Sequence, residues 1–407
     1  MKRVAVTGMG VISPVGNTVD AYFESLKAGV CGIDFITRFD TADYKVKVAA
    51  EVKNFEPSLY MERNESRKMD LFSQYAMAAS CQAVEASGIL GKVAANRFGV
   101  YIGSGVGGLE TMVNEAVKWH EGGARKVSPF FIPMMIGNMA AGNVAIRFNA
   151  QGPCLPVVTA CATSTNAIGE AYRAIKHGYA DAIIAGGAEA SILPLAVAGF
   201  TNCMALSTRN DPTCASIPFD KRRDGFIMGE GAGVLILEEY EHALNRGAKI
   251  YAEIKGYGHS CDAHHMTAPR PDGEGAAAAI SQALKEAGEK TGALYINAHG
   301  TSTPLNDKTE TLAIKTALGE KAYEAYISST KSMTGHMLGA AGAAEAMACI
   351  MALNEGILPP TIGLKEPDSE CDLNYIPGKA INVPITRAIS TSLGFGGHNA
   401  CLLMERA

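Results

Sequence analysis

Short apolar segments that meet glycines alternate with amphipathic segments along the chain. Two longer segments, residues 73–86 and 166–177, have helical spacing of apolar positions, and the second places Ile168, Ala171, Tyr172 and Ile175 on one face. Four apolar runs have the length of strands and end at or follow glycines: residues 4–6, 98–102, 182–185 and 234–237. The alternation of strands with helices predicts an α/β fold with a buried mixed sheet.

Two pairs of segments resemble each other across the chain. Residues 229–238 and 396–405 are both glycine-rich stretches leading into an apolar strand that ends in Glu. Residues 101–105 and 295–299 both end a strand and enter a loop. The second pair is further apart in the sequence than the first, so an insertion must separate the copies. We predict two similar halves, residues 1–250 and 251–407, with chance similarity of two strands as the alternative.

Composition narrows the function classes. The chain has 407 residues, 47% hydrophobic and 19% charged, which supports a large core and excludes a mainly disordered protein. A net charge of -5 offers no global basic field for nucleic acid. No uncharged apolar stretch reaches about 18 residues, so no membrane span is expected.

The N-terminal sequence and the cysteines indicate the cellular compartment. Glycines and Pro14 interrupt the first apolar run, which we interpret as a strand and turn and not as a signal peptide. The ten cysteines are scattered and include no CxxC pair, so a disulfide framework is not expected. A reducing cytoplasm is the simplest location.

The clearest candidate nucleophile is Cys161, in the segment Val157-Val-Thr-Ala-Cys-Ala-Thr-Ser-Thr-Asn166. We interpret residues 157–158 as a strand and residues 163–166 as possible caps of the next helix, so the thiol would lie at a helix N-terminus. Unpaired amide groups and the helix dipole would lower the pKa of the thiol there, and the amides could hold an oxyanion. A small buried core cysteine is the alternative.

Two histidines stand near small and hydroxyl-bearing residues. His299 ends an apolar run and enters Gly-Thr-Ser-Thr-Pro304, a position typical of a general base or donor, or else of a surface loop. His336 precedes a run of glycines and alanines, where a helix N-terminus would disfavour its protonation. Lys331 and Glu345 border this apolar segment; they are either exposed or, if buried, necessarily paired.

A fourth segment, Ser390-Thr-Ser-Leu-Gly-Phe-Gly-Gly-His-Asn399, surrounds one aromatic side chain with glycines. The glycines allow close approach of the backbone. Phe395 is therefore either a movable plug or a core side chain beside a plain turn.

Two further patterns are weak. Residues 103–108 match G-x-G-x-x-G, but Glu121, about 20 residues further on, does not end a strand, so a nucleotide site is not predicted. Cys261, His264 and His265 lack further ligands at recognised spacings. We interpret them as a solvated loop and expect no metal site.

Taken together and in this order, four segments resemble the condensing enzymes of the thiolase superfamily: Thr-Ala-Cys-Ala-Thr-Ser, Asn-Ala-His-Gly-Thr-Ser-Thr, Lys-Ser-Met-Thr-Gly-His and Gly-Phe-Gly-Gly-His-Asn. Within that superfamily the chain is most similar to the elongating ketosynthases of bacterial type II fatty acid synthesis. The resemblance covers nearly the whole chain. It implies a five-layered αβαβα thiolase-like fold of two pseudo-equivalent halves, with acyltransferase activity, in a homodimer.

The resemblance also implies roles for the motif residues. Cys161 would accept an acyl chain from acyl carrier protein, and His299 and His336 would support decarboxylation of a malonyl group before a Claisen condensation. The backbone N–H groups of Cys161 and Phe395 would form the oxyanion hole. The remaining matches are Lys331, Asp307 and Glu345 around the histidines, and Thr301 and Thr303 along the phosphopantetheine arm. No cofactor is implied, because the phosphopantetheine arrives on the carrier protein.

Acyl and carrier sites follow from the same resemblance. Val106 would gate the acyl pocket, with Phe200 near it and the segment from Phe131 reaching across the dimer. Val106 is smaller than the Ile common at this position, so medium and long chains are expected to enter at least as easily. The acidic carrier would meet a basic patch. The candidates for this patch are Arg63, Arg67, Lys68, Arg125 and Lys126. Met204 stands where relatives often carry Arg, which leaves the extent of the patch open.

Three alternatives remain. A ketosynthase of a type II polyketide pathway would use the same chemistry. A degradative thiolase would need a second cysteine near the C-terminal glycines, and Cys401 lies instead within a strand pattern. A non-catalytic chain-length factor would lack the nucleophile, whereas Cys161 is present.

Overall fold

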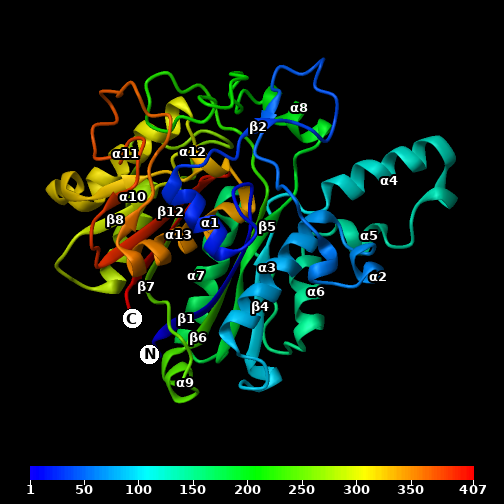
Figure 1. Ribbon diagram of the computed structural model, residues 1–407, viewed down its shortest axis with the longest axis horizontal. Coiled ribbons are helices and arrows are strands. Elements are labelled where there is room, and N and C mark those ends of the chain that lie inside the picture. The colour runs from blue at the N-terminus through cyan, green and yellow to red at the C-terminus, as the bar shows by residue number, and fades with distance from the viewer.

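The apolar runs form a nine-stranded sheet in the computed structural model, which describes residues 1–407. Its strands are ordered β4-β5-β6-β1-β7-β13-β12-β8-β9 (Figure 1). Their bounds are β1 Val4–Ile12, β4 Phe98–Gly103, β5 Ala182–Glu189, β6 Gly231–Glu239, β7 Ala252–Cys261, β8 Leu294–Asn297, β9 Tyr326–Ser328, β12 Arg387–Gly394 and β13 His398–Glu405. Two small sheets pair β2 (Asp34–Phe35) with β3 (Val48–Ala49) and β10 (Ile357–Leu358) with β11 (Ile381–Asn382).

Helices flank the sheet, and the two expected at 73–86 and 166–177 are α3 and α7. The bounds are α1 Val19–Ala28, α2 Arg63–Ser66, α3 Leu71–Ser87, α4 Leu109–Gly122, α5 Phe131–Met135, α6 Met139–Phe148, α7 Thr163–Lys176, α8 Pro194–Asn202, α9 Tyr240–Asn245, α10 Glu274–Ala287, α11 Pro304–Leu318, α12 Lys331–Thr334 and α13 Ala341–Glu355. Six 3-10 turns are η1 Pro57–Leu59, η2 Ala95–Arg97, η3 Ala124–Lys126, η4 Ala160–Ala162, η5 Gly319–Glu324 and η6 Leu338–Ala340. None of the helices has the length and apolar character needed to cross a membrane.

Strand pairing repeats across the sheet. β4 is parallel to β5, which is antiparallel to β6, and β6 is antiparallel to β1. β8, β12, β13 and β7 follow the same sequence of pairings. The two series meet where Val4–Val6 of β1 pairs with Ala252–Ile254 of β7. The segments matched in the sequence are β6 with β13 and the ends of β4 and β8, so the internal repeat is confirmed; the boundary at residue 250 stays a prediction.

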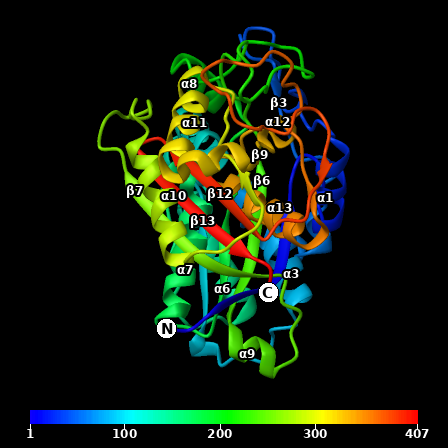
Figure 2. The ribbon, with the colours of Figure 1, turned by 90° about the vertical axis from the view of Figure 1, so that its left-hand side faces the viewer.

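Alternating side chains divide the molecule into layers. On β6, Leu235 and Leu237 pack into a central core with α7 and α13, whereas Val234 and Ile236 pack against α3 and α6. β13 alternates in the same way between the central core and the outer helices α10 and α11, which cover the face turned to the viewer in Figure 2. The layers are, in order, outer helices, the first half of the sheet, α7 with α13, the second half of the sheet, and outer helices. This is the order expected of a five-layered αβαβα fold.

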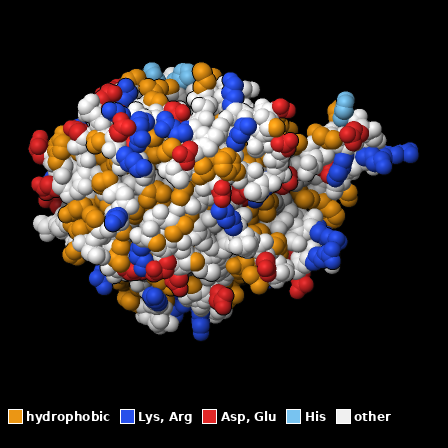
Figure 3. Space-filling view, turned by 45° about the horizontal axis from the view of Figure 1, so that its top comes forward, with side chains coloured by type: hydrophobic (Ala, Val, Ile, Leu, Met, Phe, Trp, Pro, Cys, Tyr) orange, Lys and Arg blue, Asp and Glu red, His pale blue; other side chains and the backbone are white.

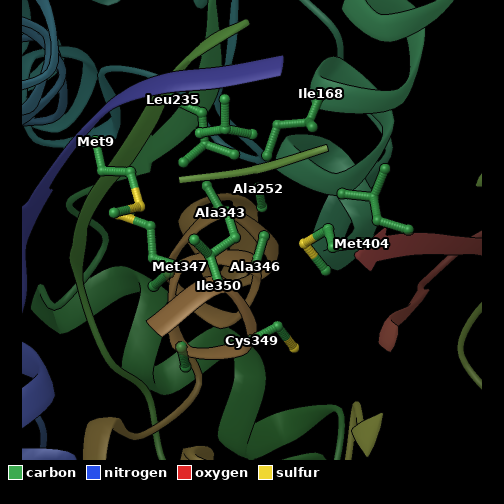
Figure 4. Packing of buried hydrophobic residues seen from close by; sticks show 14 of the residues in the cluster. Met9, Ile168, Leu235, Ala252, Ala343, Ala346, Met347, Cys349, Ile350 and Met404 are labelled. Atoms are coloured by element: carbon green, nitrogen blue, oxygen red, sulfur yellow. The ribbon is translucent and has the colours of Figure 1, made fainter. Parts of the chain in front are cut away.

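The central helix α13 is rich in alanine, which lets both halves of the sheet approach it closely. Its residues 341–355 include only one charged side chain before the last turn, Glu345. Figure 4 shows Ala343 and Met347 of this helix packed among Met9 and Leu235 of the first half. The central core is therefore shared by both halves.

Gly8 and Gly10, which we interpreted as part of a turn, lie inside β1, and other glycines also lie inside strands. β1 runs through Gly10 because α3 lies against it: a Cβ at Gly10 would be 2.0 Å from the Ala79 carbonyl oxygen. In the second half, a Cβ at Gly258 of β7 would be 1.9 Å from the Ala279 carbonyl oxygen of α10. These glycines serve helix-on-strand contact and not chain reversal.

Candidate active site

A cavity of about 370 Å³ brings together Cys161, His299, His336 and Phe395. They come from η4, from the loop after β8, from the loop before η6, and from the β12–β13 hairpin. The first belongs to the N-terminal half of the chain and the other three to the C-terminal half. The cavity thus joins all four motif segments.

Cys161 lies in the single turn η4 that leads into α7. Residues 157–158 form no strand, contrary to our expectation. The turn is closed by the Thr159 N–H, which donates to the Thr163 hydroxyl at 2.9 Å, and Ala160 takes a left-handed φ of 49°. Nor does a side chain cap α7: Thr163 and Asn166 are buried, and the Asn166 amide donates to the Thr159 hydroxyl at 2.7 Å.

The backbone N–H groups of Cys161 and Phe395 both act to lower the pKa of the Cys161 thiol. Phe395 lies at the tip of the β12–β13 hairpin, where Gly394 pairs with His398. Gly396 and Gly397 both have positive φ, 87° and 79°, so this tip requires glycine. A tight turn therefore places Phe395 close to Cys161; a Cβ at the preceding Gly394 would lie 3.3 Å from the Cys161 nitrogen.

Burial raises the pKa of the Cys161 thiol to about 12. The Lys331 charge and the two N–H groups act in the opposite direction, and Glu189 acts with burial. Our expectation of a lowered pKa was wrong, because the removal of the sulfur from water outweighs the helix N-terminus. The resting side chain is a thiol.

His336 is held by its backbone on both sides. Its N–H donates to the Ile227 carbonyl at 2.7 Å, and its own carbonyl accepts from the Gly229 N–H at 2.8 Å. The Leu338 N–H donates to His336 Nδ1 at 3.3 Å. Nδ1 is therefore the acceptor, the proton lies on Nε2, and Nε2 is buried without any hydrogen-bond partner. A donor is thus available to a ligand in the cavity.

His299 is fixed through its main chain by Glu310. The His299 N–H donates to Glu310 Oε1 at 2.7 Å and to the Thr391 hydroxyl at 3.1 Å, and the Gly300 N–H donates to Glu310 Oε2 at 2.8 Å. His299 Nδ1 is buried and unpartnered. The His299 and His336 rings are 5.3 Å apart between centroids and nearly perpendicular, at 86°.

Both imidazoles are neutral. Burial lowers the pKa of His299 and of His336 well below 6.5, and the Lys331 charge lowers both further. For His336 we expected this direction from a helix N-terminus, but α13 begins only at Ala341. The cause is burial and not the helix dipole.

Lys331 and Glu345 form a buried ion pair, and the lysine charge acts on both histidines of the cavity. Their exposed fractions are 1% and 2%, which removes the alternative that both lie on the surface. Glu345 Oε2 has no hydrogen-bond partner, so the lysine is its only charged neighbour within ion-pair distance. The pairing required of buried charges is thus present.

Asp307 does not line the cavity. It is buried, accepts from the Phe219 N–H at 2.8 Å and lies 3.6 Å from Arg223 Nε. Thr301 and Thr303 line the cavity as expected, and their hydroxyls are 3.1 Å apart.

The predicted acyl-pocket residues are outside this cavity. Val106 is 43% exposed, and Phe200 packs edge-on against Phe226 with ring centroids 5.6 Å apart. Phe226 in turn lies 5.2 Å from the His336 ring, so Phe200 is one side chain removed from the site. Phe131 begins α5 and is half-buried.

All five basic candidates are exposed, and none forms an ion pair: Arg63, Arg67, Lys68, Arg125 and Lys126. Arg63 begins α2, and Arg125 and Lys126 lie in η3, after the projecting helix α4 (Figure 1). Figure 3 shows Lys and Arg side chains on this projecting end. Met204 lines the cavity and is 88% exposed.

The two weak patterns form neither a nucleotide turn nor a metal cluster. The N–H groups of Gly105 and Val106, in the G-x-G-x-x-G loop, donate to the buried carboxylate of Glu189. Cys261 and His264 are exposed, and no group of three or more metal-binding side chains exists in the chain.

Glu189 and Glu310 are the site residues that we missed. The available signal for Glu189 was a carboxylate at the end of an apolar strand, in Ala182-Ile-Ile-Ala-Gly-Gly-Ala-Glu189. For Glu310 it was a second carboxylate close to Asp307, in the same helix α11.

Known condensing enzymes match this chain over its full length. Residues 1–243 match the family model "Beta-ketoacyl synthase, N-terminal domain" and residues 251–365 match "Beta-ketoacyl synthase, C-terminal domain". The chain is 52% identical over 408 residues to 3-oxoacyl-[acyl-carrier-protein] synthase 2 of Synechocystis sp., covering 100% of this chain and 98% of the relative. It is 50% identical over 407 residues to the protein of that name from Staphylococcus aureus, with the same coverage.

Solved structures agree. A beta-ketoacyl synthase from Burkholderia phymatum superposes with a TM-score of 0.93 at 37% identity, covering 100% of both chains. A type II polyketide ketosynthase, solved in complex with its acyl-carrier protein, superposes with a TM-score of 0.92 at 34% identity, again covering 100% of both. With the sequence motifs, the five-layered fold and the full-length matches in agreement, the chain belongs to the beta-ketoacyl synthase family.

Proposed function

We propose that Cys161, His299 and His336 catalyse the elongating reaction of this acyltransferase, a 3-oxoacyl-[acyl-carrier-protein] synthase of type II fatty acid synthesis. The observation that carries the proposal is the joint position of the Cys161 thiol, the Phe395 turn and two neutral imidazoles in one cavity. Identity of 50–52% to fatty-acid synthases, against 34% to the polyketide ketosynthase, favours the fatty-acid pathway.

In the first half-reaction Cys161 exchanges thioesters with the acyl carrier. The sulfur attacks the acyl carbonyl, the carrier's phosphopantetheine sulfur leaves, and the thiol proton ends on that leaving sulfur. The N–H groups of Cys161 and Phe395 stabilise the tetrahedral oxyanion. Because the resting group is a thiol, the proton must be transferred during the attack. His336 Nδ1 already accepts from the Leu338 N–H, so the neutral His299, whose Nδ1 has no partner, is the available base in the cavity.

In the second half-reaction a malonyl carrier takes the same entrance. Cleavage of the carboxylate as CO2 leaves an enolate on the thioester carbonyl, which His336 Nε2–H stabilises together with His299. The enolate carbon attacks the acyl-Cys161 carbonyl, the cysteine leaves as a thiolate, and this thiolate takes up one proton from solvent. The products are 3-oxoacyl carrier, CO2 and free Cys161; no resident cofactor enters the balance.

The carrier proteins bind outside the cavity. The unpaired cations Arg63, Arg67, Lys68, Arg125 and Lys126 suit an acidic carrier, and the Thr301 and Thr303 hydroxyls line the path of the phosphopantetheine arm. A carrier complex in the polyketide relative supports this mode of substrate delivery.

Acyl-chain choice lies at Val106, where a small side chain admits medium and long chains. Its loop adjoins the Cys161 turn, since a Cβ at Gly105 would be 3.4 Å from the Ala160 carbonyl oxygen. A chain-length series of acyl donors tests this: turnover that stops at short chains would contradict it.

A homodimer in the cytoplasm completes the proposal. Large apolar side chains are exposed on α4, namely Met112, Val117 and Trp119, and a second copy would cover them, with Phe131 reaching across. Light scattering on the purified chain should give twice 42.7 kDa; a monomer at micromolar concentration would remove this part of the proposal.

Intact-protein mass is the test of the function. The wild type mixed with acyl carrier thioester should gain one acyl mass and lose it, with release of CO2, when malonyl carrier is added. Cys161→Ala should gain none. No adduct on either protein would refute the nucleophile or the donor, and acyl-CoA in the same assay would separate the two.

A further inference from the structure

Glu189, at the end of β5, is a buried carboxylate to which the proposed mechanism gives no role. Ser104 Oγ–H donates to its Oε1 at 2.8 Å, and the Gly105 and Val106 N–H groups donate to its two oxygens at 2.9 and 3.2 Å. All three donors belong to the loop after β4. This loop carries the proposed gate of the acyl pocket.

The same carboxylate also holds the opposite side of the site. The Gly339 N–H, in η6, donates to Glu189 Oε2 at 3.0 Å. Gly339 directly follows Leu338, whose own N–H fixes the tautomer of His336. One carboxylate therefore connects the acyl loop to the segment that orients the proton donor for the malonyl group.

The two segments touch each other as well as Glu189. A Cβ added at Gly339 would lie 2.5 Å from the Gly105 nitrogen and 2.8 Å from Glu189 Oε2. No side chain fits between the two segments, and the Gly105 and Gly339 N–H groups both donate to Glu189 Oε2. Burial raises the pKa of the Glu189 carboxyl above 4.5, although the four donors act in the opposite direction. Because these partners donate and none accepts, their hydrogen bonds favour the anionic form.

We infer that Glu189 is a positioning residue that sets the place of the Val106 loop and the orientation of His336 at the same time. The inference rests on the proposed function and extends it to a residue that does not line the cavity. Both half-reactions then depend on one group: acylation through the loop, and condensation through His336. A negative charge on Glu189 also adds to burial in raising the pKa of the Cys161 thiol, since it opposes the thiolate.

Two substitutions separate geometry from charge. Glu189→Gln keeps the length but removes the charge and puts an NH2 group against N–H donors. Glu189→Asp keeps the charge and shortens the side chain. Glu51→Gln is the matched control, because Glu51 is also buried and accepts from the Thr37 and Arg38 N–H groups and from a hydroxyl, away from the cavity.

The first readout is condensation by pre-acylated enzyme. Each protein is loaded on Cys161, mixed with malonyl carrier, and the loss of the acyl mass is timed. Both Glu189 variants should slow this step by roughly 10- to 100-fold, as expected for a misplaced donor, and Glu51→Gln should not. Failure of the wild type to load at all would instead refute the proposed function.

The second readout is alkylation of Cys161 by iodoacetamide at fixed pH, followed by peptide mass. Glu189→Gln should react several-fold faster than wild type because the opposing charge is gone, whereas Glu189→Asp should match wild type. A purely structural role predicts parallel losses in both readouts with a lowered unfolding midpoint. Unchanged condensation in both variants, or equal alkylation rates in Gln and wild type, would overturn the inference.

Discussion

Lys331→Met would leave Glu345 as an isolated charge inside the protein. Glu345 is 2% exposed, its Oε2 has no partner, and Lys331 supplies its only ion pair. Removing one member of such a pair costs about 3–5 kcal/mol of unfolding free energy. The cost should fall at the high end, because nothing else within reach compensates the carboxylate.

The double variant Lys331→Met/Glu345→Leu removes both charges and fills the space with apolar atoms. Replacement of a whole buried pair is often neutral or stabilising, so most of the lost stability should return. The reactivity of the Cys161 thiol should not return. The Lys331 charge lowers the pKa of the Cys161 thiol, and it is absent from both variants, so alkylation of Cys161 should stay slower than in wild type.

The deficit of the single variant should also depend on pH. Burial already raises the pKa of Glu345 above 4.5, and loss of the lysine raises it further. A raised folded-state pKa favours the protonated form, so stability is retained at low pH and lost as pH rises through the folded pKa. The variant should therefore be closest to wild type near pH 5 and furthest from it near pH 8.

Urea unfolding of wild type, single and double variants, combined with timed alkylation of Cys161, provides the assay. A double variant no more stable than the single one would refute the account of an isolated charge. Recovery of alkylation together with stability would show that Lys331 acts only by holding the fold.

Three further predictions concern other parts of the structure. Gly10→Ala would place a Cβ 2.0 Å from the Ala79 carbonyl oxygen, so the unfolding free energy should fall by about 3 kcal/mol in chemical denaturation; an unchanged midpoint would contradict the close contact of α3 with β1. Since both cavity histidines have pKa values well below 6.5, condensation by pre-acylated enzyme should not slow as pH falls from 8 through 6.5, and a loss centred there would mean that an imidazole is protonated. Arg67→Glu with Lys126→Glu should raise the KM for carrier-bound substrate by roughly tenfold and leave turnover of an acyl-pantetheine unchanged; equal effects on both substrates would refute docking at these residues.

The repeat and the motif segments could be predicted because they depend on local patterns. The strand period and the glycine-rich starts of β6 and β13 are visible in the sequence. The position of Gly10 inside strand β1 is not visible in the sequence. It depends on the contact of this glycine with α3, which begins only at Leu71. A glycine read alone signals a turn, and only its neighbour in space shows otherwise.

The direction of the pKa shift of the Cys161 thiol was the largest error of our sequence analysis. The position before a helix was correct, but the direction of the pKa shift depends on how much water reaches the sulfur, which no local pattern records. The carboxylates of Glu189 and Glu310 were missed for a related reason. Most of their partners are backbone N–H groups of loops, beside the Ser104 and Thr391 hydroxyls, and backbone donors carry no signature in the residue types.

The Phe395 N–H has a consequence for how the chain acquires its reactivity during synthesis. Phe395 is translated long after Cys161, close to the end of the chain, at the tip of a hairpin whose second strand pairs with β7. A ribosome-bound chain that has already exposed Cys161 still lacks one of the two groups that stabilise an attacked carbonyl. Chains that stop before Phe395 therefore lack that donor, so the complete oxyanion site can form only after the β12–β13 hairpin has folded.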